Sequence, residues 1–227
     1  MERLKKAYNL ADSVICKLEG YMDDILKYNE SINLTAIKER DEFVEKHYVD
    51  SLSFSSFDEI KKADKILDLG TGAGFPGIPL ALAFPEKEFV LIDSLNKRLK
   101  IIDELCEKYD IHNVRTVHGR AEELGHKDEL RGSFDTCVSR AVAGTPVLLE
   151  YTAPFVKKGG NLVFYKGPEV FEELENAKKA MIVLGVKLNR IEKTQILEHN
   201  LVFLEKVEET PKKYPRKPGT PSKEPIR

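Results

Sequence analysis

Tryptophan is absent from the 227-residue chain, cysteine is scarce, and no apolar run approaches the length of a membrane-spanning helix. The three cysteines, Cys16, Cys106 and Cys137, lie far apart and form no CxxC pair. This spacing argues against a disulfide framework and against a structural zinc site. The first ten residues are charged and lack the apolar stretch of a secretory signal. We therefore expect a cytoplasmic protein with no bound metal and no membrane association.

A large excess of charge of either sign is also missing. The chain has 36 Lys and Arg against 38 Asp and Glu, for a formal net charge of −2. Any nucleic-acid surface must therefore come from local segregation of charge. The clearest local excess follows Thr210, where a Pro-rich stretch holds six basic residues and one acidic residue. Because Pro and Gly disfavour regular structure, we expect this tail to be irregular and its cations to be free to contact RNA.

The pattern of apolar and polar residues divides the chain into three parts. Over 1–64, apolar residues recur at three- and four-residue steps, which predicts one helix around 10–26 and a second around 39–54. Over 65–207, short β-rich runs alternate with longer helical runs. The remaining residues, 208–227, form the basic tail. We therefore expect an N-terminal helical subdomain, a central α/β domain and a C-terminal tail.

The central part predicts a mostly parallel sheet. Strands are expected at five positions that alternate with helices, namely 65–69, 89–93, 113–118, 134–139 and 160–165. Strands separated by helices form right-handed crossovers and therefore run parallel. Two further strands, 186–195 and 200–207, follow each other without a helix, which predicts an antiparallel hairpin at one edge. This α/β arrangement is typical of the Rossmann-like class I methyltransferases, which depend on S-adenosylmethionine (AdoMet).

The strongest local signal is a glycine-rich turn between the first strand and the following helix. An acidic residue, Asp68, stands two places before Gly70, Gly72 and Gly74. Glycines let a backbone turn tightly and approach a ligand closely. This pattern suits AdoMet, because glycine amides can take its carboxylate and a nearby acid its ammonium, directly or through water. The overlapping stretch 72–77 also satisfies GxGxxG, which would favour NAD.

Two later segments bear on the choice of cofactor. Asp93 ends the second strand, where its carboxylate can accept hydrogen bonds from ribose hydroxyls or cap the next helix. Asp93 suits either cofactor. Ala121 and Glu122 follow the third strand, where methyltransferases of this fold place groups against adenine; they offer a backbone N–H and a side chain. Together, the segments favour AdoMet over NAD.

The nature of the methyl acceptor is limited by what the chain lacks. The Asn/Asp-Pro-Pro-Tyr motif that is typical of amine methylation does not occur in the chain. Methylation at C5 of a pyrimidine needs a cysteine nucleophile, whereas the three cysteines fall within predicted helices and a strand and therefore look like packing residues. The remaining option is direct attack by an atom with a ready lone pair, such as guanine N7. That reaction needs no general base and depends on alignment and exclusion of water. An Arg bound to both O6 and N7 would block the nucleophile.

Eight segments of the chain resemble the RsmG (GidB) family of 16S ribosomal RNA guanine-N7 methyltransferases. They are NLTA at 33–36, HYVDSL at 47–52, LGTGAGFPGIP at 69–79, DSLNKR at 93–98, GRAE at 119–122, SRA at 139–141, YKG at 165–167 and YPRKPGTPSK at 214–223. The resemblance covers most of the chain and implies methylation of a guanosine in 16S rRNA of the small subunit. It also implies that the cofactor contacts fall on Gly70, Phe75, Asp93, Ser94, Leu95, Ala121, Glu122 and Arg140.

Candidate RNA contacts come from basic residues near the expected site and in the tail. They are Lys97, Arg98, Arg140, Lys166, Arg216 and Lys217. Each also has a plain alternative as a solvated, capping or ion-paired residue. We expect a monomer whose partner is 16S rRNA or the small subunit. The rival hypotheses are an NAD-dependent oxidoreductase and an RNA-binding module with a vestigial pocket.

Overall fold

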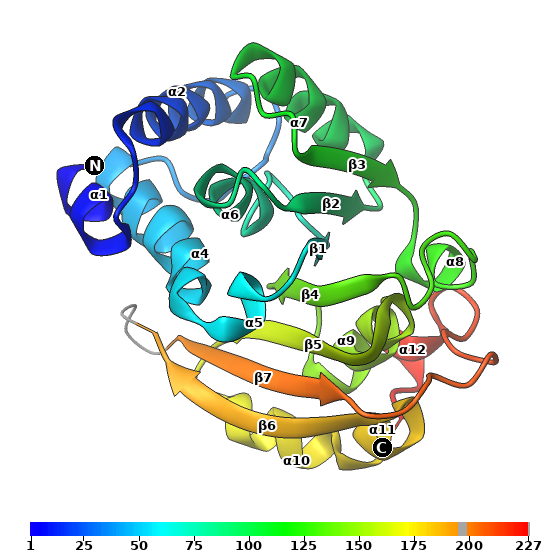
Figure 1. The fold of residues 1–227 in the computed structure, drawn as a ribbon. Helices are drawn as coiled ribbons and strands as arrows, with labels where there is room; N and C mark the ends of the chain where they lie inside the picture. The colour runs from blue at the N-terminus through cyan, green and yellow to red at the C-terminus, as the bar shows by residue number, and fades with distance from the viewer. Residues whose placement is uncertain (195–198, 227) are drawn as a thin grey trace.

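A seven-stranded sheet forms the centre of the computed structural model, which describes residues 1–194 and 199–226 (Figure 1). The strands are ordered β3-β2-β1-β4-β5-β7-β6. Their bounds are β1 Lys65–Leu69, β2 Glu88–Asp93, β3 Val114–His118, β4 Phe134–Arg140, β5 Val156–Lys166, β6 Val186–Lys193 and β7 Asn200–Lys206. The first five pair in parallel, whereas β7 runs antiparallel to both β5 and β6. The predicted parallel sheet with an antiparallel edge hairpin is confirmed.

The strand order reverses between β1 and β4, and this position determines where a ligand can bind. From β1 the chain adds β2 and β3 on one side, then crosses to β4 and β5 on the other. In open α/β sheets, ligands bind beyond the carboxyl ends of the strands at such a reversal. The ends of β1, β2 and β4 therefore face the expected site.

The N-terminal helices cover one face of the sheet together with two later helices. Their bounds are α1 Glu2–Tyr8, α2 Asp12–Asn29, α3 Arg40–Phe43, a π-helical turn Val44–Val49, α4 Asp50–Leu52, a 3₁₀ turn Ser53–Ser56, α5 Asp58–Lys61, α6 Gly77–Ala83 and α7 Asn96–Lys108. Buried side chains of these helices, such as Leu18 and Phe54, belong to one core with Ile66 and Phe89 of the strands. The helix expected around 39–54 is confirmed as one continuous helical stretch over 40–56, in which the hydrogen-bonding pattern changes from α to π, back to α and then to 3₁₀.

The opposite face of the sheet carries the later helices. They are α8 Ala121–Leu124, α9 Thr145–Thr152, a 3₁₀ turn Ala153–Phe155, α10 Val170–Asn176, α11 Lys178–Leu184 and α12 Thr220–Lys223. Their buried side chains form a second core with residues such as Leu67 and Phe164. Within the described ranges, no helix combines the length and apolarity that crossing a bilayer requires.

The C-terminal tail is irregular apart from the short helix α12, as expected, but it is docked on the protein and is not free. Figure 1 shows it beside α8 and α9, and α12 lies within it. The Arg131 guanidinium donates hydrogen bonds to the backbone carbonyls of Thr210 and Tyr214. Pro215 is buried. The composition of the tail predicted its charge correctly but gave no indication of these long-range contacts.

Candidate active site

The glycine-rich turn after β1 is held against β2 by backbone hydrogen bonds. The N–H groups of Gly70 and Thr71 both donate to the carbonyl of Ile92. Gly70 has φ +75°, and a Cβ built on it would lie 2.2 Å from a methyl group of Val142. Any larger residue at position 70 would therefore be strained and would clash with the loop after β4.

Asp68 holds this turn in place through side-chain hydrogen bonds. Its Oδ2 accepts hydrogen bonds from Thr71 Oγ1 at 2.6 Å and from the Gly77 N–H at 2.8 Å. Its Oδ1 is buried and has no hydrogen-bond partner among the residues that the structure describes. Burial raises the pKa of this carboxyl to about 6. An unsatisfied buried oxygen of this kind fits a ligand that brings a donor, such as an ammonium group.

A cavity of about 200 Å³ opens at the carboxyl ends of β1 and β2. Its lining residues are Leu69, Gly70, Ile92, Asp93, Ser94, Gly119, Arg120, Ala121, Glu122, Val142 and Tyr151. Five predicted cofactor residues are therefore brought together here: Gly70, Asp93, Ser94, Ala121 and Glu122. The Asp93 carboxylate accepts hydrogen bonds from the N–H groups of Gly72 and Leu95, one on each oxygen. These contacts leave it further lone pairs for a hydroxyl ligand.

The tail reaches the far wall of this cavity. The Gly219 N–H donates to Glu122 Oε1 at 3.0 Å, and the hydroxyls of Tyr151 and Ser222 are hydrogen-bonded at 2.9 Å. Both Glu122 and Tyr151 line the cavity. The position of two lining side chains thus depends on the docked tail.

Other predicted cofactor residues lie outside the lining of this cavity. Gly72 and Gly74 belong to the same turn, with φ of +62° and +92°. Leu95 precedes α7 and is 51% exposed. Phe75 is buried, and its ring stacks on the ring of His47 with centroids 4.3 Å apart. Phe75 therefore joins the turn to the N-terminal helices.

Arg140, at the end of β4, connects the sheet to the same helices. Its guanidinium donates to the Lys46 carbonyl, to Asp50 Oδ2 at 2.9 Å and to His47 Nδ1 at 2.9 Å. Asp50 is fully buried, and its other oxygen pairs with His199 Nδ1 at 2.9 Å. Arg140, for which a cofactor or RNA role was predicted, is thus part of a network of buried charges.

The π-helical turn brings His47 and Asp50 to Arg140. Burial, with a smaller contribution from Arg140, lowers the pKa of His47 to about 3, so its ring is neutral. Since Arg140 donates to Nδ1, the ring proton resides on Nε2, which lies 2.8 Å from Thr35 Oγ1. Sequence reasoning assigned His47 no chemistry, and it missed Asp50, although both lie in the segment 47–52.

A second cavity, of about 370 Å³, adjoins the first. Its lining residues are Arg140, Ala141, Val142, Ala143, Gly144, Tyr165, Lys166, Gly167, Glu173 and His199. Val142 belongs to both linings. Lys166 is buried there, and its Nζ donates to Glu173 Oε2 at 2.7 Å and to the Ala143 carbonyl at 2.8 Å. Neither Val142 nor Glu173 carries a motif that sequence reasoning could have recognised.

The other predicted RNA residues differ in accessibility. Lys97 and Lys217 are exposed. Arg98 lies 3.6 Å from Asp93 Oδ2, and Arg216 contacts both carboxylate oxygens of Glu150, which is fully buried. Arg216 is therefore not the free cation that was expected.

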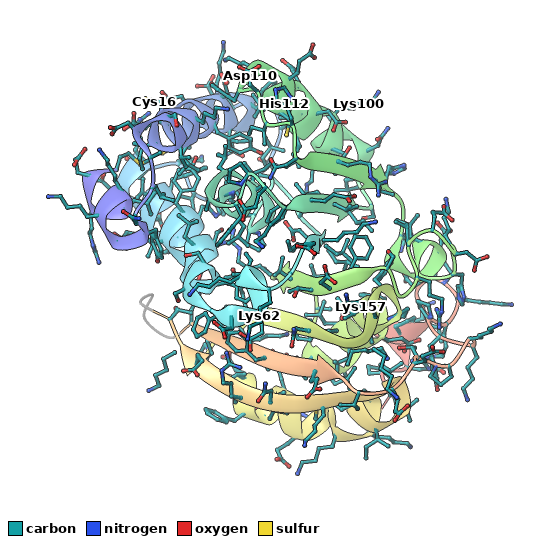
Figure 2. All side chains as sticks on the ribbon, in the orientation of Figure 1. Cys16, Lys62, Lys100, Asp110, His112 and Lys157 are labelled. Atoms are coloured by element: carbon teal, nitrogen blue, oxygen red, sulfur yellow. The ribbon has the colours of Figure 1, made fainter. Side chains whose placement is uncertain are left out.

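The cysteines occupy positions without a common site. Cys16 is exposed on α2 (Figure 2), whereas Cys106 and Cys137 are buried in α7 and β4. Burial raises the pKa of the Cys137 thiol well above its ordinary value, which suits a packing residue and not a nucleophile. In the described ranges, no group of three His, Cys, Asp or Glu side chains is arranged to hold a metal.

Comparison of the whole fold with solved structures gives similar folds at low sequence identity. An AdoMet-dependent methyltransferase from Aquifex aeolicus has a TM-score of 0.56 at 17% identity, covering 73% of this chain and 93% of the other. The pre-rRNA processing protein fibrillarin of Methanococcus jannaschii has a TM-score of 0.53 at 18% identity, covering 67% and 70%. These similarities establish the class I AdoMet-dependent methyltransferase fold.

Sequence comparison is more specific. The family model for rRNA small subunit methyltransferase G matches residues 14–202. The ribosomal RNA small subunit methyltransferase G of Clostridium tetani is 46% identical over 211 residues, covering 91% of this chain and 88% of that protein. The protein of the same name from Alkaliphilus metalliredigens is 45% identical over 226 residues, covering 97% and 94%. The chain therefore belongs to the rRNA small subunit methyltransferase G family.

Proposed function

We propose that the protein transfers the methyl group of AdoMet to N7 of a guanosine in the 16S rRNA of the small ribosomal subunit. The observation that carries this proposal is the pair of adjoining cavities at the carboxyl edge of the sheet, in a chain of this family. One cavity has the groups that an adenosine needs. The other has room for a base beside it, and Val142 lies in both walls.

The residues of the first cavity, together with Asp68 beneath the glycine-rich turn, fit the parts of AdoMet. Asp93 would accept hydrogen bonds from the ribose hydroxyls, and Ala121 and Glu122 would contact the adenine. The free oxygen of Asp68 would take the ammonium of the amino-acid end, directly or through water. When bound, AdoMet supplies a methyl group on a positively charged sulfur, which a neutral nucleophile can attack.

The surrounding protein then has to hold the acceptor base and exclude water. The N7 lone pair needs no proton removed, and the guanine ring takes on the positive charge that the sulfur loses. Fixing donor and acceptor in a near-attack geometry can supply several kcal/mol of the required barrier reduction, about 7–11 in the best oriented cases. No ionisable side chain has to act as a general base.

We place the RNA backbone along the carboxyl edge of the sheet, where α7 begins and where the tail reaches the first cavity. Lys97 and Lys217 are exposed and suit contacts with phosphates. Arg98, Arg140 and Arg216 each contact a carboxylate, so we assign them a role in positioning the site. We also propose that the chain divides into a helical subdomain at 1–64, a methyltransferase domain at 65–207 and a tail at 208–227.

The proposal is tested with tritium-labelled AdoMet and two substrates, intact 30S particles and deproteinised 16S rRNA. We expect label at one guanosine, and borohydride reduction followed by aniline should cleave the RNA there, because N7 methylation makes the ring susceptible. Absence of label in both substrates, or labelled RNA that resists cleavage, would contradict the proposal. A thermal-shift comparison of AdoMet with NAD tests the oxidoreductase rival, since only a bound ligand raises the melting temperature.

A further inference from the structure

The second cavity holds a charged pair whose hydrogen-bonding capacity is only partly used. Glu173 Oε2 accepts three hydrogen bonds, from the Thr145 N–H, the Thr145 hydroxyl and Lys166 Nζ, each at 2.7 Å. Its other oxygen, Oε1, accepts none from any residue in the described ranges. Lys166 Nζ has three hydrogens, of which two are used, on Glu173 and on the Ala143 carbonyl. The pair therefore presents one free donor and one free acceptor.

The Glu173 carboxyl is ionised at neutral pH, so its free oxygen remains an acceptor. Burial alone would raise the pKa of Glu173, but the hydrogen bonds from Lys166 and Thr145 outweigh burial and lower it. Glu173 is thus an anion with a lone pair to offer. Because its charge balances that of Lys166, the pair as a whole is close to neutral and is poorly suited to attract a phosphate.

The chemistry of N7 methylation limits how a guanine can be recognised. N7 has to remain free, so the bidentate contact to O6 and N7 is excluded. What remains is the Watson–Crick edge, on which O6 is an acceptor and N1–H and the N2 amine are donors. An acceptor beside a donor on the protein is the complement of that edge. Adenine reverses this pattern, since it presents a donor at position 6 and an acceptor at N1.

From this complementarity we infer that Lys166 and Glu173 recognise the Watson–Crick edge of the target guanine, with Lys166 donating to O6 and Glu173 Oε1 accepting from N1–H and the N2 amine. The inference rests on the proposed function and names the residues that select its base. Both residues line the cavity that adjoins the cofactor cavity at Val142, so a base held there has its ring next to the methyl donor.

The variant Glu173→Gln tests this assignment because the neighbouring donors fix the orientation of the new side-chain amide. The Thr145 and Lys166 donors require an oxygen at the position of Oε2, so the amide nitrogen has to take the position of Oε1. A donor would then face the donors of guanine. The variant keeps the acceptor that caps α9 but removes the negative charge beside the buried Lys166, so its melting temperature is expected to fall by several degrees while its AdoMet affinity matches the wild type. Glu172→Gln, an exposed neighbour on α10, is the matched control.

The measurement is kcat/KM on reconstituted small subunits that carry either guanosine or inosine at the target position. Inosine keeps O6, N1–H and N7 but lacks the N2 amine. We expect wild type and Glu172→Gln to favour guanosine about 10-fold, and Glu173→Gln to lose about 10- to 100-fold on guanosine, with the preference reduced to about one or reversed.

Two results would overturn the inference while leaving the proposed function intact. The first is wild-type protein that methylates inosine as well as guanosine, a measurement that does not depend on any variant folding. The second is a Glu173→Gln protein with the wild-type preference. If the RNA affinity of that protein also rises, Lys166 is assigned to a phosphate. If wild type does not methylate the guanosine at all, the proposed function itself has failed.

Discussion

At the residue scale, the site depends on buried ionisable side chains whose surroundings determine their charge. Asp68 has a raised pKa because it is fully buried, and His47 a lowered one for the same reason. Burial disfavours the charged form in both cases. These shifts have opposite consequences for stability, and each can be measured.

The unsatisfied oxygen of Asp68 predicts a ligand-specific effect of Asp68→Asn. At pH 8 the amide removes a disfavoured charge, so the melting temperature should stay the same or rise. The advantage of the variant should shrink as the pH falls through 6, where the wild-type carboxyl becomes protonated. AdoMet affinity, measured by calorimetry, should fall at least about tenfold, the loss of one charge-assisted hydrogen bond. Binding of 5′-methylthioadenosine, which lacks the amino-acid end, should be unchanged. An equal loss for both ligands would mean that Asp68 only shapes the turn.

The neutral His47 predicts a loss of stability in acid. Below the ordinary histidine pKa near 6.5, the unfolded chain binds a proton that the folded chain refuses until about pH 3. The unfolding free energy should therefore fall as the pH drops through this range, by up to about 1.4 kcal/mol per pH unit. His47→Asn keeps an acceptor for Arg140 and should reduce this slope in urea titrations. His112→Asn, at an exposed position, is the control; a slope unchanged in His47→Asn would contradict the assignment.

At the scale of elements, the tail acts as a structural part of the cavity proposed to bind the cofactor. Arg216 pairs with the buried Glu150, and three residues later the Gly219 N–H donates to Glu122. Removing Arg216 would leave the Glu150 carboxylate buried without a cation. Lys217, next in the chain, is exposed. Two adjacent basic residues thus have different roles.

This difference predicts different outcomes for two alanine variants. Arg216→Ala should lose about 3–5 kcal/mol of stability and roughly 10 °C in melting temperature, with weaker AdoMet binding. Lys217→Ala should stay within about 0.5 kcal/mol of wild type and bind AdoMet normally, while its RNA affinity falls. Differential scanning fluorimetry and calorimetry measure both. Equal stability of the two variants would show that the tail is not held by Arg216.

The same elements show what the sequence could and could not predict. The strands and the glycine-rich turn were predictable, because buried parallel strands are short apolar runs and tight turns need glycine. The π-helical turn was not, since a shift of the hydrogen-bond ladder leaves the pattern of apolar residues almost unchanged. The docking of the tail was also missed, because it depends on Glu150, which lies 66 residues from Arg216 along the chain. Five of the predicted cofactor residues line one cavity, whereas Val142 and Glu173 carried no recognisable pattern.

At the scale of the whole molecule, the near balance of charges means that RNA binding has to depend on a few local cations. The salt dependence of affinity counts those cations, because each neutralised phosphate releases counterions. The slope of log K against log salt concentration should become shallower by about 0.7 for each of Lys97→Ala and Lys217→Ala. Filter binding at several salt concentrations measures this slope. Lys62, beyond the amino end of β1 and paired with Asp58 (Figure 2), is the control; an equal change in Lys62→Ala would place the RNA elsewhere.

The shared position of Val142 has a consequence for the order of events in a catalytic cycle. Because this side chain belongs to the walls of both cavities, any shift that one ligand imposes on it changes the free energy of binding the other. Thermodynamic linkage then requires reciprocity: the factor by which RNA alters the affinity for the methyl donor equals the factor by which the donor alters the affinity for RNA. If AdoMet and its demethylated product affect Val142 differently, this difference would also determine how tightly the protein holds the RNA after methylation.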